Sequence, residues 1–507
     1  MAALAALVAL AAWGVHGRSL GFGFTYLDDA DLLLEDHAFL AHPRGLWRVF
    51  ARSYLHVVEP SHAYFRPLVT ASYALDAQWS GANPVGYHLT NVILHGLAST
   101  LFFRLFRRFE LGLGVSFAVA LLFAVHPALV PAVAWIPGRN DSLLTVFVLG
   151  AWLLFLRERS RPSWATLGGH WLCFALALLT KETAAVLPLV CVVQVALLER
   201  SGPARRPWRM GPVAAGWGAL LAARLVVQPV GLGTSVPDIL ANLDLLPKGL
   251  GVVLLPWNVS ALADARDRPL WPGLVSVGLL ATASVFVSGV RHRIVVAGAA
   301  AFVLFTAPAL AVPGTLTLDH RLYLPACGAL LACAEIARAL TLEPRLFGAF
   351  AGAGLAALSA MTVAYEDVFR GPLPFARDAV ASSPRCSLAH LCLGRAYQLA
   401  RDDDRALVEY RTALALGPAQ IAHNNIAVIE MASARWTEAE SELRQELSIN
   451  PRYGRAYYNL GVVLRREGRL VEACEAEEHA LQWDPADRAA GRERDSDCGY
   501  AASGAGP

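Results

Sequence analysis

Over the first 365 residues, apolar positions are grouped into blocks of about twenty, separated by short polar segments. A block of that length is long enough for an α-helix to cross the hydrocarbon core of a bilayer. The apolar segment 239–256 is interrupted by Lys248 and two prolines, and we interpret it as a helix at the outer membrane interface. The pattern predicts an all-α membrane bundle of eleven spanning helices, at residues 2–16, 87–106, 113–134, 142–158, 164–180, 183–199, 211–230, 270–290, 293–313, 322–340 and 345–364.

Basic residues occur in alternate connections between the predicted spans. Short basic loops stay on the cytoplasmic side of a membrane. With the N-terminus inside, every cytoplasmic connection carries arginine, around Arg104, Arg157, Arg200, Arg291 and Arg338. An odd number of spans then places the C-terminal part outside. The outer face receives residues 28–29, 136–141, 181–182, 231–269 and 319–321.

The composition agrees with a polytopic membrane protein. The 507 residues are 55% hydrophobic and only 17% charged, and the net charge of +2 gives no indication of nucleic-acid binding. The eight cysteines show neither a disulfide framework nor metal-ligand spacing. His88 and His95 share a helix face, and we interpret them as a hydrogen-bonding pair rather than as metal ligands. We therefore predict no metal and no cofactor apart from the substrates.

A repeat begins after the last predicted span. Prolines recur at Pro384, Pro418, Pro451 and Pro485, at intervals of 34, 33 and 34 residues, which is the tetratricopeptide period. Small residues at Gly394, Ala406, Gly461 and Ala473 would let paired helices approach closely. The pattern predicts an α-solenoid of three repeats over 384–486. Its groove would bind a protein or extended peptide, or would instead serve as a packing platform. Residues 487–507 are small and polar, and we expect them to be disordered.

Ionisable residues gather on the predicted outer face. Asp28 and Asp29 follow the first span and open a loop, 17–86, which also contains Arg66. Acids so close to a bilayer are candidate functional residues, although a solvated loop is the simpler interpretation. His126, Arg139, Asp141 and Lys181 also fall on this face. Asp141 could simply cap a helix. Lys181 could extend toward the interface, but it is also well placed to neutralise a phosphate on this face. A guanidinium at Arg139, presented at the rim by Pro137-Gly138, suits a phosphate.

Basic groups beside an acid at one membrane face suit one particular chemistry. A lipid-linked sugar phosphate would lie in the bilayer, and Arg or Lys would stabilise the charge on its phosphate leaving group. A carboxylate would remove the proton from an acceptor hydroxyl as it attacks the anomeric carbon. One base acting in a direct displacement inverts the anomeric configuration.

Several short segments, in order and spacing, resemble one known family. They are Gly23-Phe24-Thr25-Tyr26-Leu27-Asp28-Asp29, Phe65-Arg66-Pro67-Leu68, Gly86-Tyr87-His88-Leu89-Thr90-Asn91, Gly138-Arg139-Asn140-Asp141, Leu179-Thr180-Lys181-Glu182 and Leu322-Tyr323-Leu324-Pro325. Together with the repeats, they resemble the transmembrane and tetratricopeptide-repeat O-mannosyltransferase-like proteins. The resemblance implies a GT-C type membrane domain over 1–365. It also implies a polyprenyl-phosphate sugar, which is mannose in this family, as the donor, and Ser/Thr hydroxyls of a protein as the acceptor.

The resemblance also implies roles for individual residues. Asp28 and Asp29 match the family's acidic pair, so one would be the base and the other would orient it. Arg139 and Asp141 match its Gly-Arg-x-Asp segment. Lys181, followed by Glu182, matches its Ser/Thr-Lys motif. The family commonly has an acid and an arginine directly before Leu-Tyr-x-Pro, whereas this chain has Asp319-His320-Arg321. Arg321 would then contact the donor phosphate from a shifted position, or that contact would be lost.

Two other functions stay open at this point. One is a polymerase or ligase of lipid-linked glycans, and the other is a catalytically silent membrane scaffold that presents its repeats. The high content of Ala, Arg and Gly is typical of a GC-rich bacterial genome. We therefore expect an inner-membrane protein with its loops and repeats in the periplasm. In a eukaryote the same parts would face the lumen of the endoplasmic reticulum.

Overall fold

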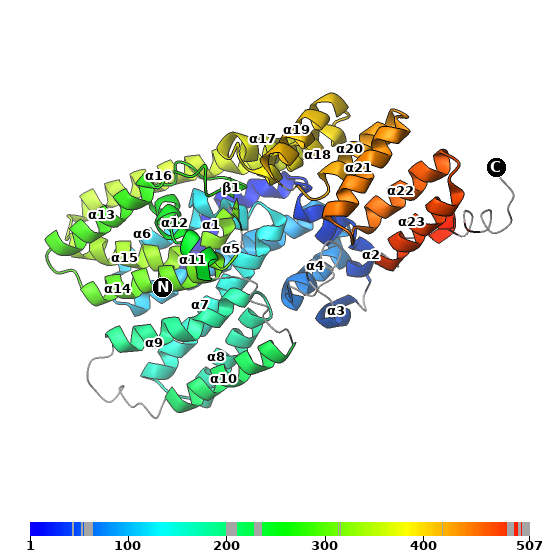
Figure 1. Ribbon diagram of the computed structural model, residues 1–507. Coiled ribbons are helices and arrows are strands. Elements are labelled where there is room, and N and C mark those ends of the chain that lie inside the picture. Colours follow the sequence, from blue (N-terminus) through cyan, green and yellow to red (C-terminus); the bar gives the residue numbers. More distant parts are fainter. Residues whose placement is uncertain are drawn as a thin grey trace. The chain divides into compact units, whose positions relative to one another are not determined.

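The computed structural model describes residues 1–42, 45–51, 54, 64–198, 210–227, 236–312, 314, 316–417, 419–483, 491–494 and 498 (Figure 1). Parts of the 17–86 loop, the basic segment after Arg200, and the repeat prolines Pro418 and Pro485 lie outside these residues. The chain divides into two compact units, Met1–Asp378 and Ala379–Pro507. Helices dominate both units. Within the described ranges, the only strands are β1 (Ala263–Asp264) and β2 (Leu316–Thr317), which pair antiparallel.

The first unit is a bundle of apolar helices. Several of them pack in pairs, α1 against α5, α7 against α8, α12 against α13 and α14 against α15. The helices are α1 (Ala2–His16), α2 (His37–Leu40), α3 (Gly45–Arg48), α4 (Pro67–Ser80), α5 (Pro84–Arg108), α6 (Leu113–Ala124), α7 (Arg139–Ser160), α8 (Trp164–Leu178), α9 (Leu187–Leu198), α10 (Met210–Val227), α11 (Val236–Ala241), α12 (Leu245–Leu254), α13 (Trp271–Phe286), α14 (His292–Leu310), α15 (Ala326–Ala339) and α16 (Pro344–Glu366).

Six helices in the described part are long and apolar enough to cross a membrane. They are Ala2–Gly21, Pro84–Arg108, Ile136–Ser160, Met210–Val227, His292–Leu310 and Pro344–Arg370. Four of the other predicted spans contain shorter apolar helices, at Leu113–Ala124, Trp164–Leu178, Glu182–Leu198 and Trp271–Phe286. The one remaining predicted span, 322–340, forms an α-helix only from Ala326, because the residues before it form a 3-10 helix that ends ahead of Pro325.

Two predicted elements differ in the structure. The span predicted for 113–134 ends as an α-helix at Ala124, because Pro127 and Pro131 lack the amide hydrogens that continue it, and the chain goes on as a 3-10 helix over Pro127–Ala132. The interfacial helix predicted for 239–256 is two short helices, α11 and α12. Gly251 and Gly273 let α12 and α13 approach so closely that a Cβ on Gly273 would lie 1.9 Å from the Pro247 carbonyl oxygen.

The second unit contains one helix pair for each predicted repeat. The pairs are α18 (Ser387–Leu399) with α19 (Asp403–Leu416), α20 (Ala422–Ala432) with α21 (Trp436–Ile449), and α22 (Gly454–Arg466) with α23 (Leu470–Trp483). The small residues have the predicted role. A Cβ on Gly394 would lie 2.6 Å from the Tyr410 ring, and Ala406 and Ala473 are fully buried between helices.

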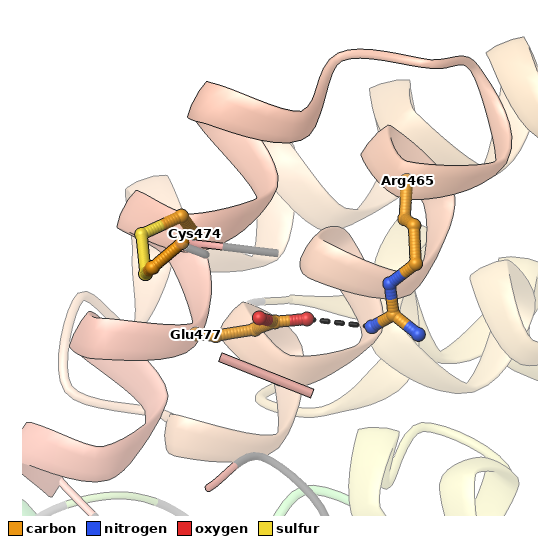
Figure 2. Close-up of a disulfide and its surroundings, with 4 residues drawn as sticks. Arg465, Cys474 and Glu477 are labelled. Atoms are coloured by element: carbon orange, nitrogen blue, oxygen red, sulfur yellow. Dashed lines mark hydrogen bonds and ion pairs between the residues drawn. A yellow bond between two sulfur atoms is a disulfide. The ribbon is translucent and has the colours of Figure 1, made fainter. Parts of the chain in front are cut away.

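The C-terminal segment contradicts two of the sequence predictions. Cys474 on α23 forms a disulfide with Cys498, 24 residues later, so the prediction that no cysteines pair is wrong (Figure 2). Residues 491–494 are helical rather than disordered, and Glu493 forms an ion pair with Arg465 on α22. Arg465 also contacts the buried Glu477 at 2.6 Å, as Figure 2 shows. The sequence did not indicate this pair, because the spacing of Cys474 and Cys498 does not reveal that they come together.

Removing this disulfide should destabilise the repeat unit. Cys498→Ser frees a 24-residue loop in the unfolded chain, which should lower the free energy of unfolding by about 3 kcal/mol. Cys392→Ser, at a free cysteine on α18, is the matched control and should change little. Calorimetry of the full chain with and without a thiol reductant checks this. Reductant should lower the unfolding temperature of the wild type and of Cys392→Ser, and should leave that of Cys498→Ser unchanged. A wild-type transition that ignores reductant would contradict the prediction.

Candidate functional site

The two acids of the predicted pair have different environments. The chain leaves the first helix through a 3-10 turn and an extended segment, and Tyr26 takes a left-handed conformation (φ 62°) that turns it back. The Asp29 carboxylate then accepts two hydrogen bonds from Thr25, from the amide at 2.5 Å and from the hydroxyl at 2.6 Å. Asp29 is 1% exposed. Its Oδ2 therefore holds the turn, which fits an orienting role better than that of a base.

Asp28, by contrast, is partly exposed, and its charged neighbours are Arg66 and Arg321. The structure gives it no hydrogen bond or ion pair among the described residues. Burial from water, together with the charges of Asp29 and Asp31, raises the pKa of Asp28 to about 7, although the two arginines oppose the shift. A carboxyl group with that pKa can take up a proton near neutral pH, as a general base must.

Arg66 is held beside Asp28 by aromatic rings and an acid. It precedes α4, and its guanidinium forms an ion pair with Glu182 at 2.6 Å. The rings of Tyr54 and Tyr64 lie 5.3 Å and 5.0 Å from its Cζ, within the range of cation–π attraction. The sequence places both tyrosines in the long first loop, but it gives no indication that they contact Arg66.

A second ion pair lies next to the first. Lys181 Nζ contacts both oxygens of Asp141, at 2.7 Å and 2.9 Å, in a nearly buried environment. His320 Nε2 lies 3.8 Å from the same carboxylate, and the ring of His320 packs against Trp135. Burial, reinforced by the charge of Lys181, lowers the pKa of His320 well below its usual value, so the imidazole is neutral. Asp141 thus neutralises Lys181 rather than serving only as a helix cap.

Arg321 is a further cation beside these two ion pairs. Its charge interacts with Asp141, Arg66 and Glu182, but in the described part of the chain its side chain forms no hydrogen bond or ion pair. It also lines a partly open cavity between α12, α14 and the β2 segment. The apolar part of the wall is made by Leu245, Ala309, Val312, Leu316, Leu318 and Leu322. We call Asp28, Arg66, Asp141, Lys181, Glu182, His320 and Arg321 the acid–cation cluster.

Arg139 lies apart from this cluster, and the rim position predicted for it is wrong. Its side chain is 0% exposed and forms an ion pair with Asp76 at 2.6 Å. It also donates to Asn91 Oδ1 and to the Tyr87 carbonyl oxygen, both at 2.7 Å. A Cβ on Gly138 would lie 2.1 Å from the Pro131 carbonyl oxygen, which explains the glycine. This arginine therefore ties α7 to α4 and α5, and we leave it out of the donor site.

Arg139→Met should therefore act on stability. It leaves the Asp76 charge buried without its partner, which costs about 3–5 kcal/mol. Arg338→Met is the control, because its buried partner Glu335 is also held by Arg291. Thermal unfolding in detergent should show a large decrease for the first variant and a small one for the second. A stable Arg139→Met protein that had lost donor binding would return Arg139 to the phosphate site.

Three more predicted residues have structural partners. His126 caps the 3-10 helix at Pro127, where its Nδ1 accepts from the Ala128 amide and its Nε2 donates to the Val253 carbonyl oxygen at 2.9 Å. Asp319 forms a two-point ion pair with Arg268, at 2.6 Å and 2.9 Å, which sequence patterns did not reveal. His95 bonds to Tyr323 and to Ala124 rather than pairing with His88, so the predicted histidine pair is wrong.

Comparison with known proteins gives a partial relationship. No family model matches the chain. It is 36% identical over 193 residues to protein O-mannosyl-transferase Tmtc1 of Drosophila melanogaster, which covers 38% of this chain and 22% of that protein. It is 32% identical over 232 residues to Tmtc2 of the same organism, covering 43% and 24%, and 37% identical over 139 residues to mouse TMTC2, covering 26% and 16%. The sequence similarity to these proteins therefore covers only part of the chain.

The matched parts thus span no more than about a quarter of these relatives' own length. Among solved structures, a chain of the APC/C hetero-tetramer Cut9-Hcn1 aligns over 93% of this chain and 94% of its own. That alignment has 14% identity and a TM-score of 0.25, which is too low to support an argument about fold or function. Similarity to O-mannosyltransferases over part of the chain is what the comparisons establish.

Proposed function

We propose that this protein is a membrane glycosyltransferase that moves a sugar, mannose by analogy with its relatives, from a polyprenyl-phosphate donor to Ser/Thr hydroxyls of a protein. The observation that carries the proposal is the pairing within the acid–cation cluster. Arg66 is matched by Glu182 and Lys181 by Asp141, which leaves Asp28 and Arg321, whose charges interact, without an ion pair in the described chain. One base and one cation are what an inverting displacement requires.

The cavity beside Arg321 suits the donor. Apolar residues of its wall would contact the isoprene units nearest the phosphate, and Arg321, on the same wall, would meet the phosphate itself. Lys248 and Arg268 stand on the same wall, but Asp244 and Asp319 already neutralise them. Arg321 therefore offers the charge that a phosphate would meet, and because its charge interacts with Asp28, the sugar would extend from the phosphate toward Asp28.

The reaction needs one proton transfer and one displacement. The acceptor oxygen bonds to the anomeric carbon while its proton passes to an oxygen of Asp28. The bond between the anomeric carbon and the phosphate oxygen breaks, and its electron pair leaves with the phosphate. Arg321 stabilises the charge that grows on that oxygen, an effect that is strong where water is excluded. Inversion at the anomeric carbon follows from the single displacement.

Insertion in a membrane is part of the proposal. Besides the six long apolar helices, the bundle exposes large apolar side chains, among them Val226 on α10, Phe286 on α13 and Phe350 on α16, at 83%, 80% and 68%. Soluble proteins rarely expose extensive apolar surface. The disulfide of the repeat unit supports an oxidising compartment for that unit, such as the periplasm or the lumen of the endoplasmic reticulum. The repeats would there recruit the acceptor.

The direct test is sugar transfer by the purified full chain in detergent. Polyprenyl-phosphate mannose is the donor and a Ser/Thr-rich peptide the acceptor, and the product is analysed for anomeric configuration. We expect mannosylated peptide with inverted configuration. Retention of configuration would contradict the single displacement, and silence across several sugars would contradict the enzyme.

A catalytically silent scaffold is the second candidate. The observation in its favour is that Arg139 and Lys181, both predicted to bind the donor phosphate, are held in ion pairs. A scaffold would keep its function in cells when Asp28 is replaced, and would lose it when the repeats are deleted. A lipid-linked glycan ligase, the remaining alternative, would prefer a glycan over the peptide as acceptor.

A further inference from the structure

The segment just before the acidic pair is bound along the end of α16. His16 Nδ1 lies 2.5 Å from Glu366 Oε1, and both side chains are 0% exposed, although the two residues are 350 positions apart. A buried polar pair of this kind is costly to desolvate, so it is weak evidence for stability alone. The contact joins the last residue of α1 to the last residue of α16.

Further contacts continue the same association toward Asp28. Arg18 donates to the Val363 carbonyl oxygen and to Asp367 Oδ1, both at 2.5 Å. Arg370 closes the series, because its carbonyl oxygen accepts from the Gly23 amide at 3.1 Å and its guanidinium lies over the Phe22 ring. We call residues 363–370 the strap.

The strap ends beside the turn that carries the acids. Gly23 stands two residues before Thr25, whose amide and hydroxyl hold the Asp29 carboxylate. The chain from the strap to Asp28 therefore has a hydrogen-bonded anchor at Gly23 and a second at Thr25. This leaves the backbone between Gly23 and Asp29 little freedom to move independently of residues 363–370.

We infer that the strap positions the acidic pair, with Glu366 and Asp367 as positioning residues that act on Asp28 through the 16–23 segment. The inference rests on the proposed function for its catalytic meaning, but the mechanical link is a property of the fold alone. Because α17 (Pro372–Ser382) follows the strap directly, the same backbone leads from the acid site into the repeat unit.

Two variants of the full chain test the link. Asp367→Asn removes the acid that pairs with Arg18 and Arg370, and Glu366→Gln removes the charge beside His16. Asp402→Asn is the matched control, since Asp402 also pairs with an arginine three residues later and asparagine still caps its helix. If Glu366→Gln does not fold, Asp367→Asn alone decides.

Hydrogen exchange of peptides covering residues 22–31 is the readout that needs no turnover. We expect exchange to quicken roughly two- to fivefold in Asp367→Asn, because its ion pairs are half exposed, and roughly tenfold or more in Glu366→Gln. The control should match wild type. Unchanged exchange in a folded Asp367→Asn protein would overturn the inference, whether or not the protein transfers sugar.

A second readout separates positioning from loss of folded protein. If the strap shields Asp28 from water, loosening it should move the acidic limb of the pH profile of kcat/KM to lower pH, toward the ordinary aspartate value. Destabilisation alone would lower kcat/KM at every pH without shifting the apparent pKa of the profile. That outcome would mean that the strap has only a structural role. If wild type shows no transfer, the proposed function fails while the exchange experiment still stands.

Discussion

Asp28→Asn should lower kcat by about 10²–10⁴-fold, the contribution expected of a general base. Asparagine keeps the shape of the side chain but cannot take the acceptor's proton. Asp29→Asn should cost less than about tenfold, since its amide oxygen can still accept from Thr25. Equal losses in the two variants would contradict the separate roles that their environments imply.

The pH dependence provides a second check on Asp28. With its pKa raised to about 7, the carboxyl must lose its proton before it can act as a base. The kcat/KM of wild type should therefore rise with pH through about 7 and level off above it. Donor binding by Asp28→Asn, measured by equilibrium binding of labelled lipid, should stay close to wild type. Turnover retained by Asp28→Asn with a normal pH profile would remove Asp28 from the mechanism.

Arg321→Met should also reduce kcat strongly, by about 10²–10³-fold. The variant removes the charge that faces the developing phosphate while leaving the paired residues of the acid–cation cluster intact. Arg321→Lys should recover part of the loss, because lysine keeps the charge but not the two-pronged geometry of a guanidinium.

The control for this series is Arg104→Met, an exposed arginine on the predicted cytoplasmic side. It should leave kcat unchanged. Of these two variants, only Arg321→Met should bind the donor more weakly than wild type. High salt should reduce this difference in affinity less than it would for a contact exposed to solvent, because salt screens a buried charge less. If Arg321→Met keeps full activity, Arg321 does not contact the donor phosphate, and the result would favour the catalytically silent scaffold.

The sequence was sufficient for the helices because their signals are local. Apolar blocks and a repeat period can be recognised from residues close together in the sequence. Pro127 and Pro131 also lie where the α-helix of the predicted third span ends. The role of Arg139 could not be predicted, since its partners Asp76 and Asn91 come from other helices and no spacing reveals them. The same holds for Arg268, which reaches Asp319 from 51 residues away.

The acidic pair was predictable as a pair but not as two roles. Only the fold shows that Thr25 holds Asp29 and that the charge of Arg321 acts on Asp28. The disulfide was missed for a related reason, because no spacing reveals that Cys474 and Cys498, 24 residues apart, come together in the fold.

The burial of Arg139 has an evolutionary consequence. A descendant that lost its chemistry would still need Gly138 and Arg139 to bring three helices together, so selection for folding alone would preserve that segment. Its presence in a genome marks ancestry and carries no information about turnover. Pseudoenzymes of this lineage should instead be recognisable by substitutions at Asp28 and Arg321, which a merely folded protein is free to lose.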